Sequence, residues 1–208
     1  PFRLPASSMQ KAYSSLPGIY RGIRYSDEAL RHFFQTASAM PWFKHTLFVI
    51  TADHNFLANQ DSLGYYNNGI GLYAVPVLYY KPDDPDLSRH DTSYTQQIDI
   101  LPSVLDYLHY PYPFFAFGQS VFDHQANHYV YTQMSEHHQL LMDGYVMTSD
   151  GEKLKSCYAY KADSLLRHPI QQDSVLQSMR LRMKAYRQLL QNSMIDNSLS
   201  VSRFTGKR

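Results

Sequence analysis

Asp53 and His54 are the adjacent pair in this sequence best suited to bind a divalent metal ion. A carboxylate supplies a hard oxygen ligand and an imidazole supplies a nitrogen ligand. The pair directly follows Thr46–Ala52, an apolar, β-branched run typical of a strand buried in a parallel sheet. Ligands of open α/β sheets bind at the carboxyl ends of strands, so this position favours a metal site. The alternative is that Asp53 caps the following turn and His54 lies on the surface.

Arg89 and His90 form a second, weaker candidate site. They follow the next apolar run of the chain, at the same predicted sheet edge, where they could contact a phosphate group. A solvent-exposed surface turn is the alternative. We therefore place them only as weak substrate-binding candidates.

The remaining reactive side chains favour structural roles. His137 and His138 are adjacent on a predicted strand, so they point to opposite faces and are poorly placed to bind one ion together. Cys157 is the only cysteine, which excludes an internal disulfide, and it is expected to be a packed thiol. The cations between Arg180 and Arg187 could meet membrane phosphates, although a solvated helix face is the preferred interpretation.

The first half of the chain alternates predicted helices and strands, which is an α/β pattern. Residues 1–24 are expected to form an extended loop, and a helix is expected from Ser26, which could cap it, to Met40. Strands are expected over 46–52 and 71–80, with a polar loop over 55–70 between them. A second helix is expected over 92–108, with Pro102 tolerated only near its first turn.

The second half has a different pattern. Short antiparallel strands are expected over 128–132, 138–149 and 153–160, with Asp150–Gly151 as a hairpin turn. Residues 171–192 place their apolar side chains at helical spacing. The expected fold is therefore α/β, with a largely parallel sheet flanked by helices, a small antiparallel C-terminal sheet and a long C-terminal helix.

Composition excludes several classes of protein. The 208 residues carry a formal net charge of +1, which does not favour nucleic acid as a partner. A hydrophobic fraction of 44% excludes a disordered chain. No apolar run reaches the roughly 18–20 residues that a membrane-spanning helix needs.

Four stretches in order resemble the alkaline-phosphatase superfamily, and more narrowly its sulfatase-like branch of lipoteichoic acid synthases and phosphoethanolamine transferases. The stretches are 25–34 with Phe48–His54, Ala74–Tyr79, Gln96–Leu108 and Phe114–Ser120. The resemblance covers about residues 18–122. It implies that residues 1–122 are the C-terminal half of a catalytic domain and that residues 123–208 complete the same domain.

The resemblance also implies a split active site. The family's N-terminal half brings an acidic ligand and the nucleophile, and its C-terminal half brings the Asp-His pair, here Asp53 and His54. Pro1-Phe2 is similar to the end of a His-Pro-Phe motif, so we expect the missing N-terminal half to belong to the same protein. No residue of this chain is assigned as the catalytic nucleophile, and the chain alone is expected to be inactive. Tyr65–Asn68 stand where some relatives place a further histidine.

The resemblance implies a metal-dependent phosphotransferase or hydrolase acting on phosphate or sulfate esters. The metal is expected to be divalent (Mn, Zn, Mg or Ca), and the substrate a lipid-headgroup or sugar ester. A catalytic domain outside the cytoplasm is implied, held at the cell membrane through the absent N-terminal region. A true sulfatase acting on sulfated sugars and a non-catalytic domain that binds a headgroup or a partner are the alternatives.

Overall fold

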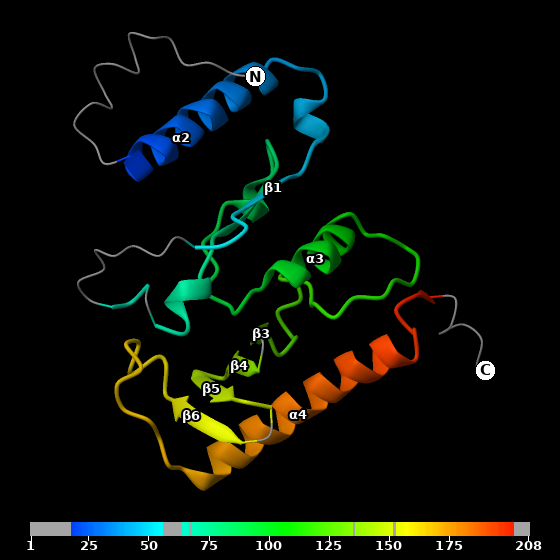
Figure 1. The fold of residues 1–208 in the computed structure, drawn as a ribbon. Helices are drawn as coiled ribbons and strands as arrows, with labels where there is room; N and C mark the ends of the chain where they lie inside the picture. The colour runs from blue at the N-terminus through cyan, green and yellow to red at the C-terminus, as the bar shows by residue number, and fades with distance from the viewer. Residues whose placement is uncertain (1–17, 56–63, 67, 135, 152, 202–208) are drawn as a thin grey trace. The chain divides into compact units, whose positions relative to one another are not determined.

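The computed structural model describes residues 18–55, 64–66, 68–134, 136–151 and 153–201 (Figure 1). The chain divides into two compact units, one of Pro1–Phe48 with Leu78–Arg89 and the other of Val49–Val77 with His90–Arg208. The expected division at residue 122 of one catalytic domain stays a prediction. None of the helices in the described ranges is long and apolar enough to cross a membrane.

Helix α2 (Gly18–Ala37) opens the described chain, eight residues before the predicted start. Ser26 is not a cap: it lies inside the helix, where its hydroxyl donates to the Gly22 carbonyl at 3.2 Å. The helix therefore begins at Gly18, and the expected loop over 18–24 was wrong. The expected extended segment over residues 1–17 lies outside the described residues.

Strands β1 (Phe48–Thr51) and β2 (Val77–Tyr80) pair in a two-stranded sheet. Phe34 packs against Phe48 and Tyr80, with ring centroids 5.1 and 5.7 Å apart, and so joins α2 to both strands. The strands are half-exposed rather than buried on both faces as predicted. Membership of a larger parallel sheet stays a prediction.

The predicted strand over 71–80 forms only from Val77. Gly71–Tyr73 is instead a 3₁₀ turn, η2, because the Asn68 carboxamide oxygen accepts the Ile70 and Gly71 N–H groups at 2.9 and 2.8 Å. A Cβ at Gly71 would lie 2.0 Å from the Tyr65 carbonyl oxygen, so only glycine allows this close approach. Most of the predicted loop over 55–70, namely 56–63 and 67, lies outside the described residues.

The predicted helix over 92–108 is shorter than expected. A 3₁₀ turn, η4 (Gln97–Asp99), leads into α3 (Ile100–Tyr107), which holds Pro102 in its first turn as predicted. The Asp99 carboxylate accepts the Gln96 N–H at 2.9 Å and so fixes where the helical turn begins.

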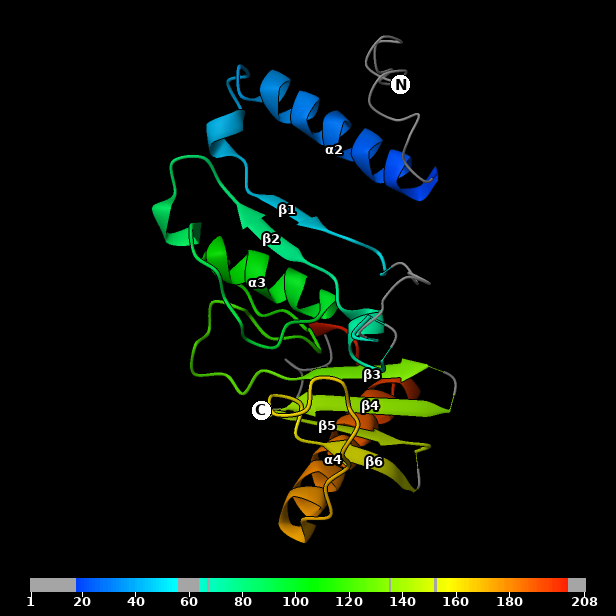
Figure 2. The same cartoon turned by 90° about the vertical axis from the view of Figure 1, so that its left-hand side faces the viewer.

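The predicted antiparallel C-terminal sheet is confirmed, with strands β3 (Val130–Met134), β4 (His137–Met142), β5 (Tyr145–Ser149) and β6 (Leu154–Tyr158) in that order (Figure 2). The single strand expected over 138–149 is two strands. Asp143 and Gly144 have φ of 51° and 84°, the left-handed pair that a two-residue hairpin turn requires.

The long C-terminal helix is confirmed as α4 (Asp173–Ile195), and it packs on one face of this sheet (Figure 2). Leu176, Met179 and Met183 are spaced three and four residues apart on α4 and meet Leu140 and Met147 of the sheet. The opposite face of the sheet buries a smaller cluster of Ile70, Leu141 and Val146. This opposite face positions the candidate site.

Candidate active site

Asp53 and His54 form the turn that follows β1. One Asp53 carboxylate oxygen accepts the His54 N–H at 2.9 Å, and the other lies 3.5 Å from His54 Nε2. The two side chains are 86% and 79% exposed, so water or a metal ion can reach both. Asp53 Oδ1 therefore caps the turn, as the alternative interpretation of the sequence expected. Asp53 Oδ2 and His54 Nε2 remain close enough to bind the same cation.

Asn55 orients His54. The His54 Nδ1 atom lies 2.9 Å from the Asn55 carbonyl oxygen, which can only accept, so this bond requires the proton on Nδ1. The Nε2 lone pair is then available to a metal, an arrangement common among metal-binding histidines. The Asn55 side chain in turn donates to the Gly71 carbonyl at 2.8 Å and ties the turn to η2.

Gln97 connects the turn to the start of α3. Its Nε2 atom donates to the Ala52 carbonyl at 2.7 Å and contacts the Asp53 carbonyl at 3.3 Å, across more than forty residues of sequence. Its neighbour Gln96 accepts the Tyr131 N–H at 3.1 Å and so joins the same segment to β3. The Gln97 side chain therefore holds the backbone at Asp53, and the Gln96 side chain holds the same segment to β3.

The buried Asp99 carboxylate links the backbone at Gln96 to the backbone at Gln119. It is 2% exposed and accepts two backbone N–H groups, those of Gln96 at 2.9 Å and Gln119 at 2.8 Å. Burial raises the pKa of Asp99, and the two N–H groups partly oppose that rise. A Cβ at Gly118 would lie 2.1 Å from the Ile98 carbonyl oxygen, so the 114–120 stretch needs glycine to reach Asp99.

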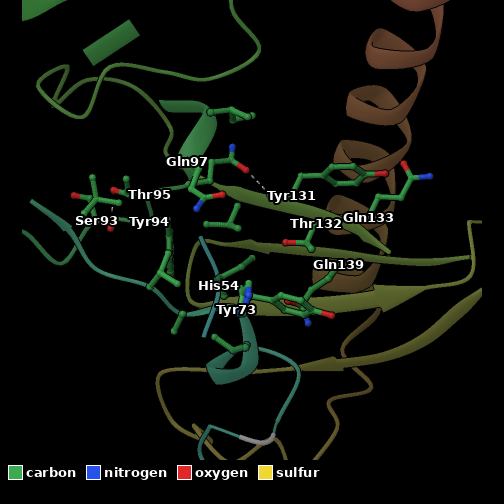
Figure 3. A pocket seen from close by; sticks show the side chains of 18 of the residues that line it. His54, Tyr73, Ser93, Tyr94, Thr95, Gln97, Tyr131, Thr132, Gln133 and Gln139 are labelled. Carbon is green, nitrogen blue, oxygen red and sulfur yellow. Dashed lines mark hydrogen bonds between the residues drawn. The ribbon is translucent and has the colours of Figure 1, made fainter. Parts of the chain in front are cut away.

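A cavity of about 550 Å³ opens beside Asp53 and His54 (Figure 3). Its floor is the sheet face opposite α4, where the cross-strand pairs Val130–Leu141 and Thr132–Gln139 lie. The Thr92–Ile98 segment forms one wall, and Tyr73 and Tyr160 also line the cavity. No lysine or arginine is among the described lining residues, so hydrogen-bonding hydroxyl and amide groups dominate its polar surface.

Tyr160 is a hydrogen-bonding group of this cavity and not a proton-transfer group near neutral pH. Its hydroxyl lies 3.4 Å from that of Tyr65. This hydrogen bond, together with burial, raises the pKa of Tyr160 to about 12. The phenol therefore remains protonated and can only donate or accept hydrogen bonds.

The weaker candidates lie outside the cavity lining. The Arg89 guanidinium donates to the Asp86 carbonyl at 2.8 Å, and both Arg89 and His90 are exposed. His90 lies two residues before Thr92, which does line the cavity. Their contact with substrate stays a prediction.

Two other groups singled out in the sequence, the His137–His138 pair and Cys157, have the structural roles predicted for them. His137 is exposed and His138 is buried, so the two imidazoles do lie on opposite faces of β4. The His138 Nδ1 atom is 2.6 Å from the Tyr131 hydroxyl, and burial lowers the pKa of this imidazole. Cys157 is a buried free thiol whose pKa is raised by burial, as expected for a packing residue.

The chemistry of Asp53 and His54 fits part of a divalent-metal ligand set. Within the described ranges, no group of three or more His, Cys, Asp or Glu side chains is arranged to hold a metal ion. Two donors with an accessible Nε2 and a free carboxylate oxygen suit a site whose other ligands come from elsewhere.

Sequence reasoning found the two candidate ligands but missed the residues that position them. The resemblance over Gln96–Leu108 assigns no role to its members, although a carboxylate three residues after Gln96 has the spacing of a capping box. No local signal indicates that Gln97 would reach Ala52 or that Asn55 would bond to Gly71.

Comparisons with known proteins give one family match and a similar solved structure. Residues 4–110 match the family model described as Sulfatase. The fold is similar to the crystal structure of a protein in the alkaline phosphatase superfamily from Vibrio parahaemolyticus, with a TM-score of 0.73 and 22% sequence identity. That match covers 95% of this chain and 47% of the other, so the chain spans about half the length of its structural neighbour. No curated protein sequence matches significantly. Because the family model covers just over half of the chain, including the Asp53–His54 turn, the chain belongs to the Sulfatase family.

Proposed function

We propose that this chain is the C-terminal half of the catalytic domain of a metal-dependent enzyme that transfers or hydrolyses phosphate esters. Asp53 and His54 are two ligands of its divalent metal ion, which is Mn, Zn, Mg or Ca. The observation that carries the proposal is the imidazole with a free Nε2 lone pair, 3.5 Å from a free carboxylate oxygen, at the mouth of a cavity. The family model and the superfamily fold support an enzyme acting on phosphate or sulfate esters.

A bound divalent ion neutralises charge on an ester oxygen and lowers the pKa of a hydroxyl nucleophile. The chain's own residues would hold and orient that ion: Asn55 fixes the tautomer of His54, and Gln97 fixes the backbone at Asp53. The neighbouring cavity would receive the esterified group, because its lining offers neutral hydrogen-bond donors and acceptors. The nucleophile and the remaining ligands are proposed to come from the N-terminal half.

The substrate is proposed to be an ester of a lipid headgroup or of a sugar. The location is proposed to be outside the cytoplasm at the cell membrane, reached through the N-terminal region. A sulfatase acting on sulfated sugars would use the same Asp-His pair. Only the substrate that is hydrolysed distinguishes it from this proposal.

The decisive experiment compares Asp53→Ala and His54→Ala in the full-length protein with Asp123→Ala and His168→Ala. The controls remove the same groups from exposed positions outside the site. The assay measures hydrolysis of p-nitrophenyl phosphate, bis-p-nitrophenyl phosphate and p-nitrophenyl sulfate with added Mn²⁺. We expect loss of at least about a thousandfold in kcat/KM for both site variants, because each removes a metal ligand, and little change for the controls.

Three outcomes would contradict the proposal in different ways. Full activity in both site variants would refute the metal assignment. Activity on the sulfate ester alone would show a sulfatase. A full-length protein that binds Mn²⁺ through Asp53 and His54 but turns over none of the esters would show a non-catalytic domain.

A further inference from the structure

The floor of the cavity beside Asp53 and His54 carries polar groups that metal binding does not require. All the described lining residues of this cavity belong to the second of the two compact units, so the cavity is a feature of that unit alone. Its volume of about 550 Å³ lies within the roughly 300–1,000 Å³ typical of small-molecule sites. The floor is therefore a candidate surface for binding the organic part of the ester.

One register row of the four-stranded sheet consists of uncharged polar side chains. Thr132 of β3 pairs with Gln139 of β4, Gln139 with Thr148 of β5, and Thr148 with Ser156 of β6. Leu141, two residues from Gln139 and therefore on the same face, belongs to the apolar cluster opposite α4. The row thus lies on the cavity side of the sheet, and Thr132 and Gln139 line the cavity.

The two halves of this row differ in their hydrogen bonds. Thr148 Oγ1 and Ser156 Oγ lie 2.7 Å apart and satisfy each other. The side chains of Thr132 and Gln139 make no hydrogen bond to any residue that the structure describes, although both are half-buried. Half-buried polar groups without a protein partner bind water or a ligand. The floor therefore presents a hydroxyl, an amide N–H₂ group and an amide oxygen to the occupant of the cavity.

Gln139 lies next to the segment that holds the candidate metal ligands. A Cβ at Gly69 would be 3.0 Å from Gln139 Nε2, so glycine at this position leaves room for the amide. The Gly71 carbonyl, two residues further on, accepts the Asn55 side chain at 2.8 Å, and the Asn55 carbonyl is bonded to His54. An ester bound at the turn that carries His54 would therefore place its organic group in the cavity that Gln139 floors (Figure 3).

The described lining offers no fixed charge beyond Asp53 and His54 themselves. It holds no lysine or arginine and no further carboxylate. Hydrogen bonding to Tyr65 and burial raise the pKa of Tyr160 to about 12, so this phenol is neutral as well. An ammonium group would have to compete with the metal for Asp53, and burying a charge without a partner is unfavourable. A hydroxyl group fits this lining, because amides and hydroxyls can both donate to it and accept from it.

We propose that Thr132 and Gln139 bind hydroxyl groups on the organic part of the ester, and that they select an uncharged polyol or sugar over a headgroup carrying an ammonium or a carboxylate. Glycerol and sugars share this chemistry, since both carry hydroxyls on adjacent carbon atoms. Val130 and Tyr73 in the same lining pack against the carbon skeleton. The inference rests on the proposed function, because it assigns the organic part of the ester on which that enzyme acts.

The test uses the full-length protein with added Mn²⁺ and four p-nitrophenyl phosphodiesters, whose second ester group is glycerol, glucose, ethanolamine or glycerate. The leaving group is the same in all four, so differences in kcat/KM report the second group. We expect the glycerol or the glucose ester to exceed the ethanolamine and glycerate esters at least about tenfold, because two neutral hydrogen bonds contribute a factor of roughly 2 to 12 each. A preference for glucose would identify a sugar and a preference for glycerol a smaller polyol, and both support the inference.

The double variant Thr132→Val/Gln139→Leu keeps the approximate shape of both side chains and removes their hydrogen-bonding groups. It should lower the glycerol-to-ethanolamine ratio of kcat/KM to about one, mainly by raising KM for the glycerol ester, since contacts made equally in the ground and transition states act on KM. The control Thr36→Val/Gln125→Leu makes the same changes at exposed positions outside the cavity and should keep the ratio of the parent.

A second variant predicts a gain that misfolding cannot produce. Gln139→Glu places a carboxylate on the floor, where it can pair with an ammonium group. The kcat/KM for the ethanolamine ester relative to the glycerol ester should rise at least about tenfold, because hydrogen bonds to charged groups are the stronger class. Circular dichroism checks that each variant folds.

Two results would overturn the inference and leave the proposed function intact. One is a parent enzyme that hydrolyses the ethanolamine or glycerate ester best, and the other is a Thr132/Gln139 double variant that keeps the ratio of the parent. If neither these esters nor bis-p-nitrophenyl phosphate is hydrolysed, the proposed function fails instead. Calorimetric titration with glycerol phosphate and Mn²⁺ then tests the floor by itself: binding about tenfold weaker in the double variant supports the inference, and equal binding refutes it.

Discussion

Replacing Asp99 with alanine tests whether one buried carboxylate holds the frame of the candidate site. Asp99 accepts the N–H groups of Gln96 and Gln119, and its removal leaves both without their partner in a region where water has limited access. Each unsatisfied group costs about 1–3 kcal/mol, so the gross loss is about 2–6 kcal/mol. The variant also removes the unfavourable free energy of burying a carboxylate, so we expect a loss in the lower half of the range of about 2–6 kcal/mol.

We therefore expect Asp99→Ala to lower the free energy of unfolding by about 3 kcal/mol and the melting temperature by about 6–12 °C. Asp99→Asn keeps one acceptor and should lose about half as much. The measurement is urea denaturation followed by circular dichroism. Asp123→Ala is the matched control: its carboxylate also accepts a backbone N–H, that of Gln125 at 3.0 Å, but at an exposed position where water can replace it.

An Asp99→Ala variant as stable as Asp123→Ala would refute the reasoning, because two backbone donors would then be satisfied without the carboxylate. A loss equal in the Asn and Ala variants would show that negative charge matters and not the number of acceptors. Either result would mean that the two hydrogen bonds to Asp99 do not hold the segment that carries Gln96 and Gln97.

The Asp99 carboxylate also makes stability depend on pH. Its pKa in the folded protein is raised above the ordinary value of 3.8. Its contribution to stability is therefore fully present below pH 3.8 and is lost as the pH rises through the pKa of the folded protein. The stability of the parent chain relative to Asp99→Asn should therefore grow as pH falls from about 7 to about 4, as denaturation curves at stepped pH would measure, and a difference that shrinks instead would contradict the sign. Gln97→Ala should cost no more than about 1 kcal/mol of stability, because the carbonyls of Ala52 and Asp53 can turn to water, yet it should free the turn that carries the candidate ligands. Hydrogen exchange at the His54 amide should become faster than in Gln125→Ala, and equal protection in the two variants would deny Gln97 its positioning role.

Local sequence signals determined much of the fold. Apolar spacing at three and four residues predicted α4, and Leu176, Met179 and Met183 are indeed the residues that it buries. Alternation predicted the C-terminal strands, and Asp150–Gly151 marked a real turn. The same rule applied to Asp143–Gly144 would have divided the strand expected over 138–149, because that dipeptide also takes positive φ values.

Other boundaries were decided by contacts between distant residues. Ser26 has the residue type of a helix cap, yet α2 continues through it from Gly18. Residues 71–73 continue the composition of the following strand, but Asn68 and the close approach of Gly71 to Tyr65 fold them into a 3₁₀ turn. Propensity describes what a segment prefers alone, and these neighbours are not part of the segment.

The sequence by itself determined the chemistry of the candidate site: a carboxylate and an imidazole, adjacent, after a strand. Side-chain type is a local property, and the order of a strand and its following turn is local as well. Only the tertiary structure decided how these groups are held, through Asn55 to Gly71, Gln97 to Ala52 and Asp99 to Gln119. Each of these bonds spans at least sixteen residues, and a hydrogen bond needs atoms placed to within a few tenths of an ångström, which only the folded chain can provide.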